Sequence, residues 1–286
     1  MSKLKEPTTY DEQIEKLKAR NIVISDRQDC FDFLNCISYY RFTAYYLQFK
    51  GPDDKCRTNV DFTTLKRIYE FDKKMRSLIM INIEDIEIYI KTKMAYYLAH
   101  TYGADGYLDP KIYNTRHNHK KFLDRISLCI DENKNTRIVK HHIKKYSGKF
   151  PIWVIIEFFS IGMISHMYRD LNAGDRKAIA KRLNVNYIVL ESWLRCITDL
   201  RNKCAHYSRL YYTIFTAVPK VPTGVSFVSG RKLFSQLYML KQIYPDALNW
   251  NANFVIPLSE LIAEYKDDID LTCMEFPNDW QETLTK

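Results

Sequence analysis

Arg201, Asn202 and His206 form a cluster whose residue types suit proton transfer and charge stabilisation at a phosphate ester. A histidine side chain titrates near neutral pH, so His206 could take a proton from a ribose 2′-hydroxyl or give one to the leaving 5′-oxygen. The Arg201 guanidinium could stabilise charge that develops on the phosphate, and the Asn202 amide could orient the imidazole or the phosphate. The cluster therefore predicts RNA cleavage without a metal ion, with these three residues as the catalytic residues.

The segment before this cluster predicts a helix, from residue 187 to about residue 206, that would hold the cluster in place. Asn202 and His206 are four residues apart and share a side of that helix. Arg201 lies about 100° away around the helix axis, so its long side chain must reach across to the other two. Lys203 and Arg209 add positive charge beside the cluster and are predicted RNA contacts. The same residues could instead form a buried network that ties helices together, and this segment alone leaves both interpretations open. The apolar stripe that anchors the helix comprises Leu190, Trp193, Leu194, Ile197 and Leu200.

A second pair, Arg137 and His142, has the same spacing as Arg201 and His206. With 16 arginines and 7 histidines in 286 residues, chance supplies about one such pair. This pair lies in the run Arg-Ile-Val-Lys-His-His-Ile-Lys-Lys, which a solvated or phosphate-facing basic helix explains without any catalytic role. We therefore interpret the second pair as a coincidence of composition.

The elements that must position the cluster are predicted to be helices. The chain has only 8 Gly and 9 Pro, against about 20 and about 14 at average usage. A sandwich or barrel would need more such turn residues, so we expect an all-α protein. Residues 62–102 predict one long helix or two stacked helices, and residues 231–244 and 257–266 predict the last two helices. We expect one composite domain over residues 1–286, with a helical lead-in at about 8–50 and a small loop or hairpin near 217–230.

The overall charge favours a polyanionic partner. The formal net charge is +9 and the isoelectric point is about 9.0, so neutralisation of RNA phosphates is physically reasonable. The seven cysteines include no CxxC pair, which argues against a zinc site or a disulfide framework, and we expect no metal and no cofactor. No apolar run is long enough to be a signal peptide or to span a membrane. These features predict a cytoplasmic protein that does not bind membranes.

An ordered set of short motifs gives the chain a resemblance to a known family. It resembles the Abi-like (AbiD/AbiF-type) abortive-infection proteins, a bacterial phage-defence group in the HEPN superfamily. The motifs are Tyr10-Asp11-Glu12-Gln13-Ile14, Ile37-Ser38-Tyr39-Tyr40-Arg41-Phe42, Ile83-Glu84, Pro151-Ile152-Trp153, Ser160-Ile161-Gly162, Ser192-Trp193-Leu194, and the run from Leu200 to Tyr211.

The resemblance implies a HEPN-like helical bundle with additional N- and C-terminal helices. It implies that Arg201, Asn202 and His206 are the ribonuclease motif, and that two copies of the chain form one composite site as a homodimer. It also implies a phage-defence role and possible restraint by a cognate structured non-coding RNA. Members of the superfamily can be inactive, so a non-catalytic RNA-binding or RNA-sensing protein of the same fold is the alternative.

The run from Ser38 to Tyr46 has two interpretations. Arg41 could hold a phosphate while neighbouring tyrosines stack on bases, and we retain Arg41 as a predicted RNA contact. The aromatic residues could instead wedge the N-terminal helices onto the bundle, and packing is the favoured interpretation for most of them.

Overall fold

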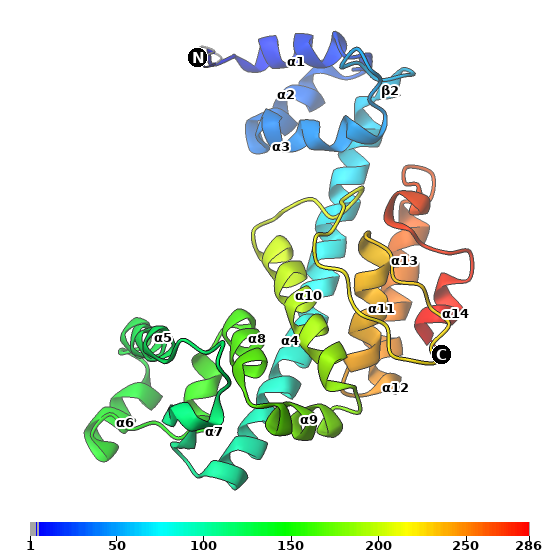
Figure 1. The fold of residues 1–286 in the computed structure, drawn as a ribbon. Helices are drawn as coiled ribbons and strands as arrows, with labels where there is room; N and C mark the ends of the chain where they lie inside the picture. The colour runs from blue at the N-terminus through cyan, green and yellow to red at the C-terminus, as the bar shows by residue number, and fades with distance from the viewer. Residues whose placement is uncertain (1–3, 5, 286) are drawn as a thin grey trace.

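A single long helix, α4 (Phe62–Tyr102), runs through the molecule and carries the other elements on its sides (Figure 1). The computed structural model describes residues 4 and 6–285. Asp61 caps the start of α4, because its side chain accepts a hydrogen bond from the Thr63 N–H at 2.7 Å. The helix ends at Gly103, whose φ of 82° falls in a region open to glycine. The stretch from residue 62 to residue 102 is therefore one helix of 41 residues and not two stacked helices.

The N-terminal residues form a module with an apolar core of its own at one end of α4 (Figure 1). Its elements are α1 (Tyr10–Lys18), α2 (Arg27–Cys36), α3 (Tyr39–Thr43) and the 3-10 helix η1 (Ala44–Gln48). Two short strands, β1 (Ile22–Val23) and β2 (Val60–Asp61), pair in parallel. The expected helical lead-in is present, but this strand pair was not expected, because two-residue strands leave no periodic pattern in a sequence.

The middle of the chain continues with shorter helices beside the C-terminal half of α4 and beyond it (Figure 1). The basic stretch at residues 120–145 is two helices, separated at residues 133–136. The elements of this region are η2 (Gly106–Leu108), η3 (Pro110–Ile112), α5 (His119–Glu132), α6 (Arg137–Tyr146), α7 (Ile152–Ile155), η4 (Ile156–Phe158), α8 (Ile161–Asp170), α9 (Ala173–Arg182) and α10 (Tyr187–Ala205).

The C-terminal part packs on the other side of α4 (Figure 1). Residues 217–230, predicted to be a loop or hairpin, contain no strand and form a loop. The predicted last two helices correspond to α11 and α13, and two short α-helices, a π-helix and a 3-10 helix accompany them. The elements are α11 (Leu233–Ile243), α12 (Ala247–Trp250), the π-helix η5 (Asn251–Val255), α13 (Ile256–Glu264), the 3-10 helix η6 (Leu271–Met274) and α14 (Trp280–Thr285).

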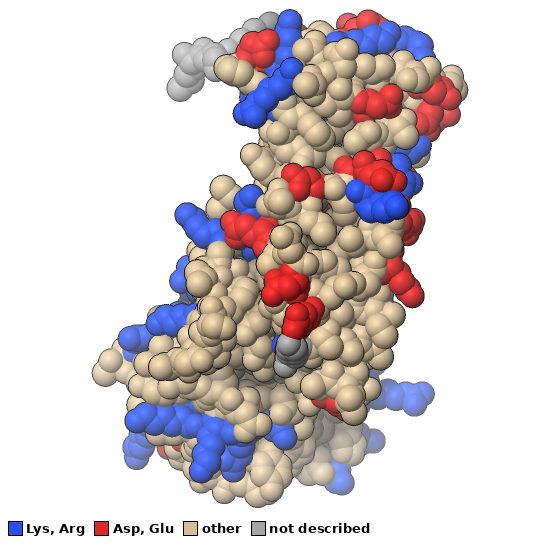
Figure 2. Space-filling model, turned by 90° about the vertical axis from the view of Figure 1, so that its right-hand side faces the viewer, with Lys and Arg blue, Asp and Glu red and all other residues tan. Residues whose placement is uncertain are grey.

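Charge is unevenly spread over the surface. Figure 2 shows acidic side chains gathered around the C-terminus and basic side chains gathered at the end of the molecule remote from the N-terminal module. Two acidic residues of the C-terminal part pair with α4: Glu264 with Lys74 at 2.6 Å and Asp268 with Arg67 at 2.5 Å. The remote end includes α5 and α6, and residues 119–146 carry eight Lys or Arg against three Asp or Glu. The positive excess is therefore concentrated away from the C-terminal helices.

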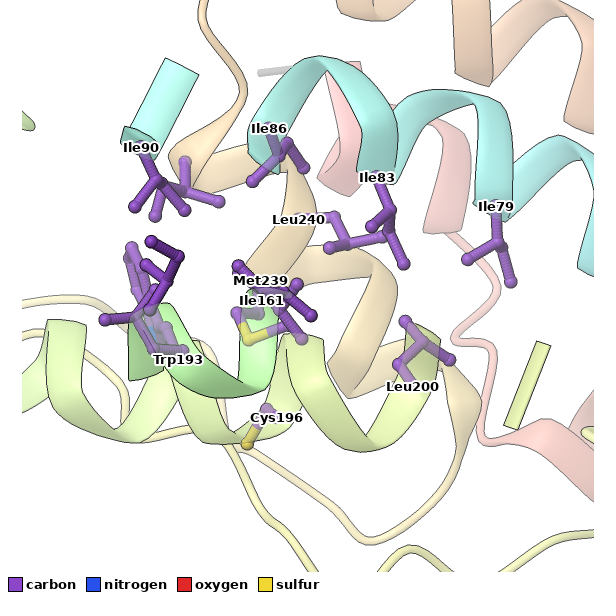
Figure 3. Close-up of a cluster of buried hydrophobic side chains, with 14 of the residues drawn as sticks. Ile79, Ile83, Ile86, Ile90, Ile161, Trp193, Cys196, Leu200, Met239 and Leu240 are labelled. Atoms are coloured by element: carbon purple, nitrogen blue, oxygen red, sulfur yellow. The ribbon is translucent and has the colours of Figure 1, made fainter. Parts of the chain in front are cut away.

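The main core forms where α10 and α11 meet the middle of α4. Ile79, Ile83, Ile86 and Ile90 follow one face of α4 and are fully or almost fully buried. Figure 3 shows these side chains directed toward α10 and α11, with Leu240 among them. A helix that is buried on several sides needs apolar residues on more than one face, which α4 has. Among the described residues, no helix is long and apolar enough to cross a lipid bilayer.

Two leucines on neighbouring elements test this core. Leu240 is fully buried, whereas Leu248 is 84% exposed. Leu240→Ala should lower the free energy of unfolding by about 2–5 kcal/mol, because it removes buried methyl groups and leaves a cavity. Leu248→Ala should change it by less than about 0.5 kcal/mol. Chemical denaturation at one protein concentration measures both, and equal effects of the two changes would contradict this account of the core.

Candidate functional site

The predicted catalytic cluster lies at the C-terminal end of α10, where the helix closes in a tight hydrogen-bonded turn. The helix ends at Ala205 and His206 caps it. The Tyr207 N–H donates to the Cys204 carbonyl at 3.1 Å, and the Ser208 N–H donates to the Lys203 carbonyl at 2.8 Å. This is the Schellman pattern of helix termination, which places the residue after the cap in the left-handed conformation.

Tyr207 occupies that left-handed position with a φ of 56°. Glycine usually fills it, and a residue with a large side chain adopts it only at a cost of about 1–3 kcal/mol. The conformation turns the chain sharply away from α10, and the Tyr207 side chain remains 67% exposed. Backbone strain is therefore stored next to His206, and the contacts that hold the following residues in place must offset it.

The three predicted catalytic residues remain accessible at this end of α10. The Arg201 guanidinium donates from Nη1 to the Asn202 Oδ1 at 3.3 Å, so these two side chains are brought together. His206 and Asn202 are exposed, and among the described residues the His206 imidazole has no hydrogen-bond or ion-pair partner. The arrangement differs from the buried Arg/Asn network that the sequence left open, because only Arg201 is partly buried.

A groove beside Arg201 is formed with α4. Its volume is about 390 Å³, and the α4 residues that line it include the exposed Ile81 and Ile88 and the acidic Glu84 and Glu87. Glu87 is paired with Lys91 on the next turn at 2.8 Å. Arg201 therefore faces a groove that contains both apolar and charged side chains.

The predicted RNA contacts Lys203 and Arg209 both have partners within the protein. Lys203 pairs with Asp199 at 3.4 Å. The Arg209 guanidinium donates to the Ala44 carbonyl in η1, and burial lowers the pKa of this group. Arg209 thus joins the segment after α10 to the N-terminal module, and its role as an RNA contact stays a prediction.

Arg41, the third predicted RNA contact, is exposed and lies over the turn at the end of α10. Its Nη1 donates to the Tyr207 carbonyl, so α3 contacts the strained residue directly. In the same run, Tyr45 is buried and Tyr40 is 89% exposed. Packing therefore explains Tyr45, whereas Tyr40 is free to stack on a base.

Cys204, inside the motif, is not a nucleophile at neutral pH. Its side chain is buried between α10 and the core, and this burial raises the pKa of the thiol to about 12. A thiol of that pKa stays protonated, and a protonated thiol is a poor nucleophile. Among the described residues, no group of three or more His, Cys, Asp or Glu side chains is arranged to hold a metal ion.

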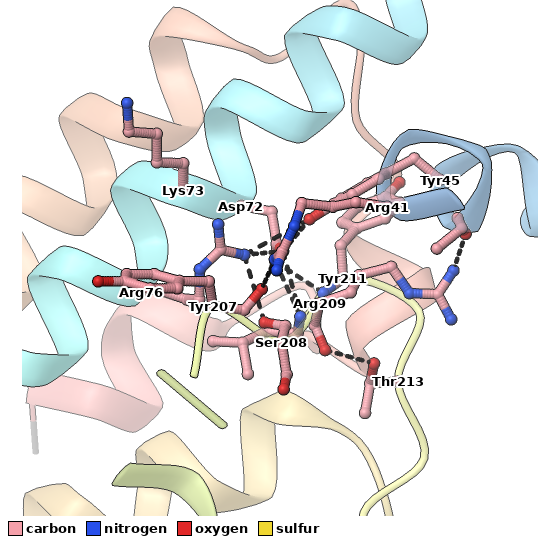
Figure 4. Close-up of polar contacts among 12 residues, drawn as sticks. Arg41, Tyr45, Asp72, Lys73, Arg76, Tyr207, Ser208, Arg209, Tyr211 and Thr213 are labelled. Carbon is pink, nitrogen blue, oxygen red and sulfur yellow. Dashed lines mark hydrogen bonds and ion pairs between the residues drawn. The ribbon is translucent and has the colours of Figure 1, made fainter. Parts of the chain in front are cut away.

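A fully buried carboxylate, Asp72 on α4, holds the segment that follows the motif (Figure 4). Asp72 accepts hydrogen bonds from the Leu210 N–H at 3.1 Å, the Tyr211 N–H at 2.8 Å and the Tyr45 hydroxyl at 2.7 Å. It also pairs with Arg76 one turn along α4. Burial raises the pKa of this carboxyl, and the Arg76 charge and the donors act in the opposite direction.

Arg76 extends this cluster to the turn itself, because its Nη1 also donates to the Ser208 carbonyl at 3.3 Å. Arg76 therefore holds the Ser208 carbonyl, and Asp72 holds the amides of Leu210 and Tyr211. Sequence reasoning missed both residues. The available signal was an acid and a base four residues apart, which directly follow Phe71 and Met75 on the apolar face of a long helix.

The second arginine–histidine pair, Arg137 and His142, lies on α6, where the two side chains differ in their exposure. His142 is buried on α6, where its Nδ1 donates to the Ile138 carbonyl at 2.8 Å and its ring stacks on the Phe150 ring at 5.1 Å between centroids. The sequence suggested a solvated helix, and Arg137 is indeed exposed, but His142 is part of the packing.

The Asp72 cluster can be tested by one conservative change. Asp72→Asn keeps the shape but removes the charge, which leaves Arg76 without its partner. We expect a loss of about 3–5 kcal/mol in the free energy of unfolding, the usual cost of breaking a buried ion pair. The Leu210 and Tyr211 amides should also exchange with deuterium much faster. Asp131→Asn, which removes an exposed pair with Lys134, is the control and should change neither measurement. Unchanged amide exchange in Asp72→Asn would contradict the assigned role.

Comparison with known proteins assigns the chain to a family. A family model described as Abi-like protein matches residues 32–212. The match begins in α2 and includes α4, the Asp72 cluster and the whole motif at the end of α10. No curated protein and no solved structure matches the chain. Because the family model covers more than half of the sequence, the chain belongs to the family of Abi-like proteins.

Proposed function

We propose that this chain is a metal-independent endoribonuclease of the HEPN type that acts in abortive infection. Membership of the Abi-like family indicates the abortive-infection role. The observation that carries the nuclease proposal is the exposed His206 imidazole beside the hydrogen-bonded Arg201 and Asn202, on a turn held by a buried ion pair. A catalytic imidazole must reach its substrate and must stay in place, and this arrangement meets both conditions.

The proposed reaction uses the ribose of the RNA as its own nucleophile. His206 takes the proton of the 2′-hydroxyl, whose oxygen attacks the adjacent phosphorus while the bond to the 5′-oxygen breaks. Arg201 stabilises the additional negative charge on the phosphate, and Asn202 keeps the guanidinium in position. The leaving 5′-oxygen must receive a proton, and the products carry a 2′,3′-cyclic phosphate and a 5′-hydroxyl.

A second copy of the chain would complete this chemistry. One motif supplies one histidine, but the reaction removes one proton and delivers another. Two histidines, one from each copy, would serve these two steps best. The exposed Ile81 and Ile88 flank the groove beside Arg201, and exposed apolar side chains rimmed by charge are typical of protein interfaces. We therefore include in the proposal a homodimer whose two motifs meet, with a structured RNA as the partner that restrains it.

The catalytic test compares two histidines. His206→Ala should lower the cleavage rate by about a hundredfold or more, the usual scale for a general acid–base residue. The exposed His141 is the control, and His141→Ala should cleave at the wild-type rate. Cleavage should continue in EDTA and should stop when the scissile nucleotide carries deoxyribose. A gel assay with end-labelled RNA measures each case.

Full toxicity in cells together with full RNA binding by His206→Ala would defeat the nuclease proposal. The non-catalytic RNA-binding protein of the same fold would then take its place. RNA that copurifies with the chain, detected by its absorbance before and after ribonuclease treatment, would support a restraining partner in either case.

The assembly test uses Ile81, an exposed apolar residue of the groove beside Arg201. Ile81→Glu should raise the dimer dissociation constant at least tenfold and lower RNA cleavage in parallel, because a charge would be buried at the interface. Leu248→Glu places the same charge at an exposed position on α12 that does not line the groove, and it should change neither quantity. Light scattering over a range of concentrations measures the mass. A wild-type protein that stays monomeric with and without RNA would contradict the dimer.

A further inference from the structure

A basic pocket lies between the start of α5 and the helix α8, on elements that contribute nothing to the motif. Its volume is about 240 Å³. Lys121 and Arg125 are exposed at its opening, whereas the side chains of His117 and Asp170 are 5% and 10% exposed. Arg169 also lines it. The pocket therefore has a buried polar interior and a positively charged entrance.

The pocket is lined by one described carboxylate, that of Asp170, and it already has partners within the protein. Asp170 pairs with Arg169 at 2.8 Å and contacts His117 Nδ1 at 3.4 Å. Lys121 and Arg125 are one helical turn apart on α5, and neither forms an ion pair with any residue that the structure describes. Like charges at this spacing repel each other, and no carboxylate among the described residues pairs with either of them.

The helix that carries these two cations adds to the positive potential. The N-terminus of a helix is the positive end of its dipole and favours an anion or an acidic side chain. The first turn of α5 contains no acidic residue and contains Lys120 and Lys121 instead. Asn118 caps the helix by accepting the Lys121 N–H at 2.9 Å and also lines the pocket. The sequence of this turn is therefore unfavourable unless an anion binds from outside.

The pKa of His166 on α8 is affected by cations from both helices that form the pocket. Burial lowers the pKa of its imidazole, and the charges of Arg169, Arg125 and Lys121 lower it further, against the opposing effect of Asp170. Cations from two different helices therefore act on one exposed ring. A bound anion at this point would interact favourably with all of them at once.

The interior of the pocket is held rigid by aromatic and imidazole contacts. The Tyr113 ring stacks on His117 at 3.9 Å between centroids, and His117 Nε2 lies 3.2 Å from His119 Nδ1. A site with fixed polar groups loses little free energy in ordering itself around a ligand.

We propose that this pocket is a binding site for a phosphate monoester, separate from the motif at the end of α10. A dianionic phosphate matches the convergent cations, and arginines bind phosphate oxygens with paired donors. The volume is below the roughly 300–1,000 Å³ typical of pockets for larger organic ligands, so a phosphate with its sugar fits best. The phosphate could belong to a free nucleotide or to the 5′ end of an RNA strand. This inference does not depend on the nuclease proposal.

The first experiment compares two double variants of the full chain. Lys121→Gln with Arg125→Gln removes the unpaired cations at the pocket. Lys140→Gln with Lys144→Gln removes two exposed charges one helical turn apart on α6, outside the pocket. Inorganic phosphate should raise the unfolding temperature of the wild type and of the control variant more than sodium chloride of equal ionic strength. The pocket variant should lose this difference and, without phosphate, should unfold at the same or a higher temperature than the wild type.

The second measurement follows His166 by NMR, with His166→Gln to assign its signal. Phosphate should raise the pKa of His166 in the wild type and in the control variant, because a bound anion offsets the nearby cations. The pocket variant should show no phosphate-dependent shift. A structural role for Lys121 and Arg125 would leave this titration insensitive to phosphate.

Nucleotide ligands then identify the source of the phosphate. We would compare adenosine monophosphate with RNA oligonucleotides that carry a 5′-phosphate or a 5′-hydroxyl, with 2′-O-methyl riboses to prevent cleavage. Tighter binding of the 5′-phosphorylated strand, lost at least tenfold in the pocket variant, assigns the site to an RNA end. Binding of the mononucleotide without any preference between the strands assigns it to a free nucleotide. No phosphate-specific response in the wild type, or the same loss in both double variants, would overturn the proposal.

Discussion

The buried carboxylate of Asp72 is the interaction on which the arrangement of the motif depends. It is fully buried and accepts hydrogen bonds from two consecutive backbone amides, Leu210 and Tyr211, that lie far from it in the sequence. The ordered turn at residues 206–208 lies between this anchor and the last turn of α10. Since Tyr207 is held in the left-handed conformation, the segment would relax if the anchor were lost. The stability of a distant buried ion pair and the position of His206 are therefore linked.

The N-terminal module is connected to the same anchor. Tyr45 donates to Asp72, Arg41 donates to the Tyr207 carbonyl, and Arg209 donates to the Ala44 carbonyl. Two arginines that the sequence suggested as RNA contacts are thus engaged in joining α3 and η1 to the end of α10. A change in the orientation of the module would therefore alter the contacts that hold the turn carrying His206. The part of the module from residue 32 onward, which includes α3 and η1, lies within the region that matches the Abi-like family model.

The sequence was sufficient for the features that depend on local periodicity. The pattern of residues 62–102 predicted α4 as one long helix or two stacked ones, and the stripe before Arg201 predicted α10 and the side of it that Asn202 and His206 share. The features it did not predict depend on pairing across long stretches of chain. The contact between Asp72 and Tyr211 joins residues 139 positions apart, and no spacing rule within one helix reveals it. The roles of Arg209 and of the two-residue strands were hidden for the same reason.

The two candidate sites lie near opposite ends of α10, which explains how they could act independently. Glu191, in the first turns of α10, lies 3.8 Å from Arg116 at the basic pocket, whereas His206 caps the other end of the helix. His206 follows Glu191 by 206 − 191 = 15 residues, which is about 22 Å along a helix, so a phosphate held in the pocket does not contact the motif directly. A strand of RNA fixed by its end in the pocket would have to follow the length of α10 to present a ribose to His206. Any coupling between the two sites must therefore pass through the ligand itself or through the packing of α10 against α4 and α8.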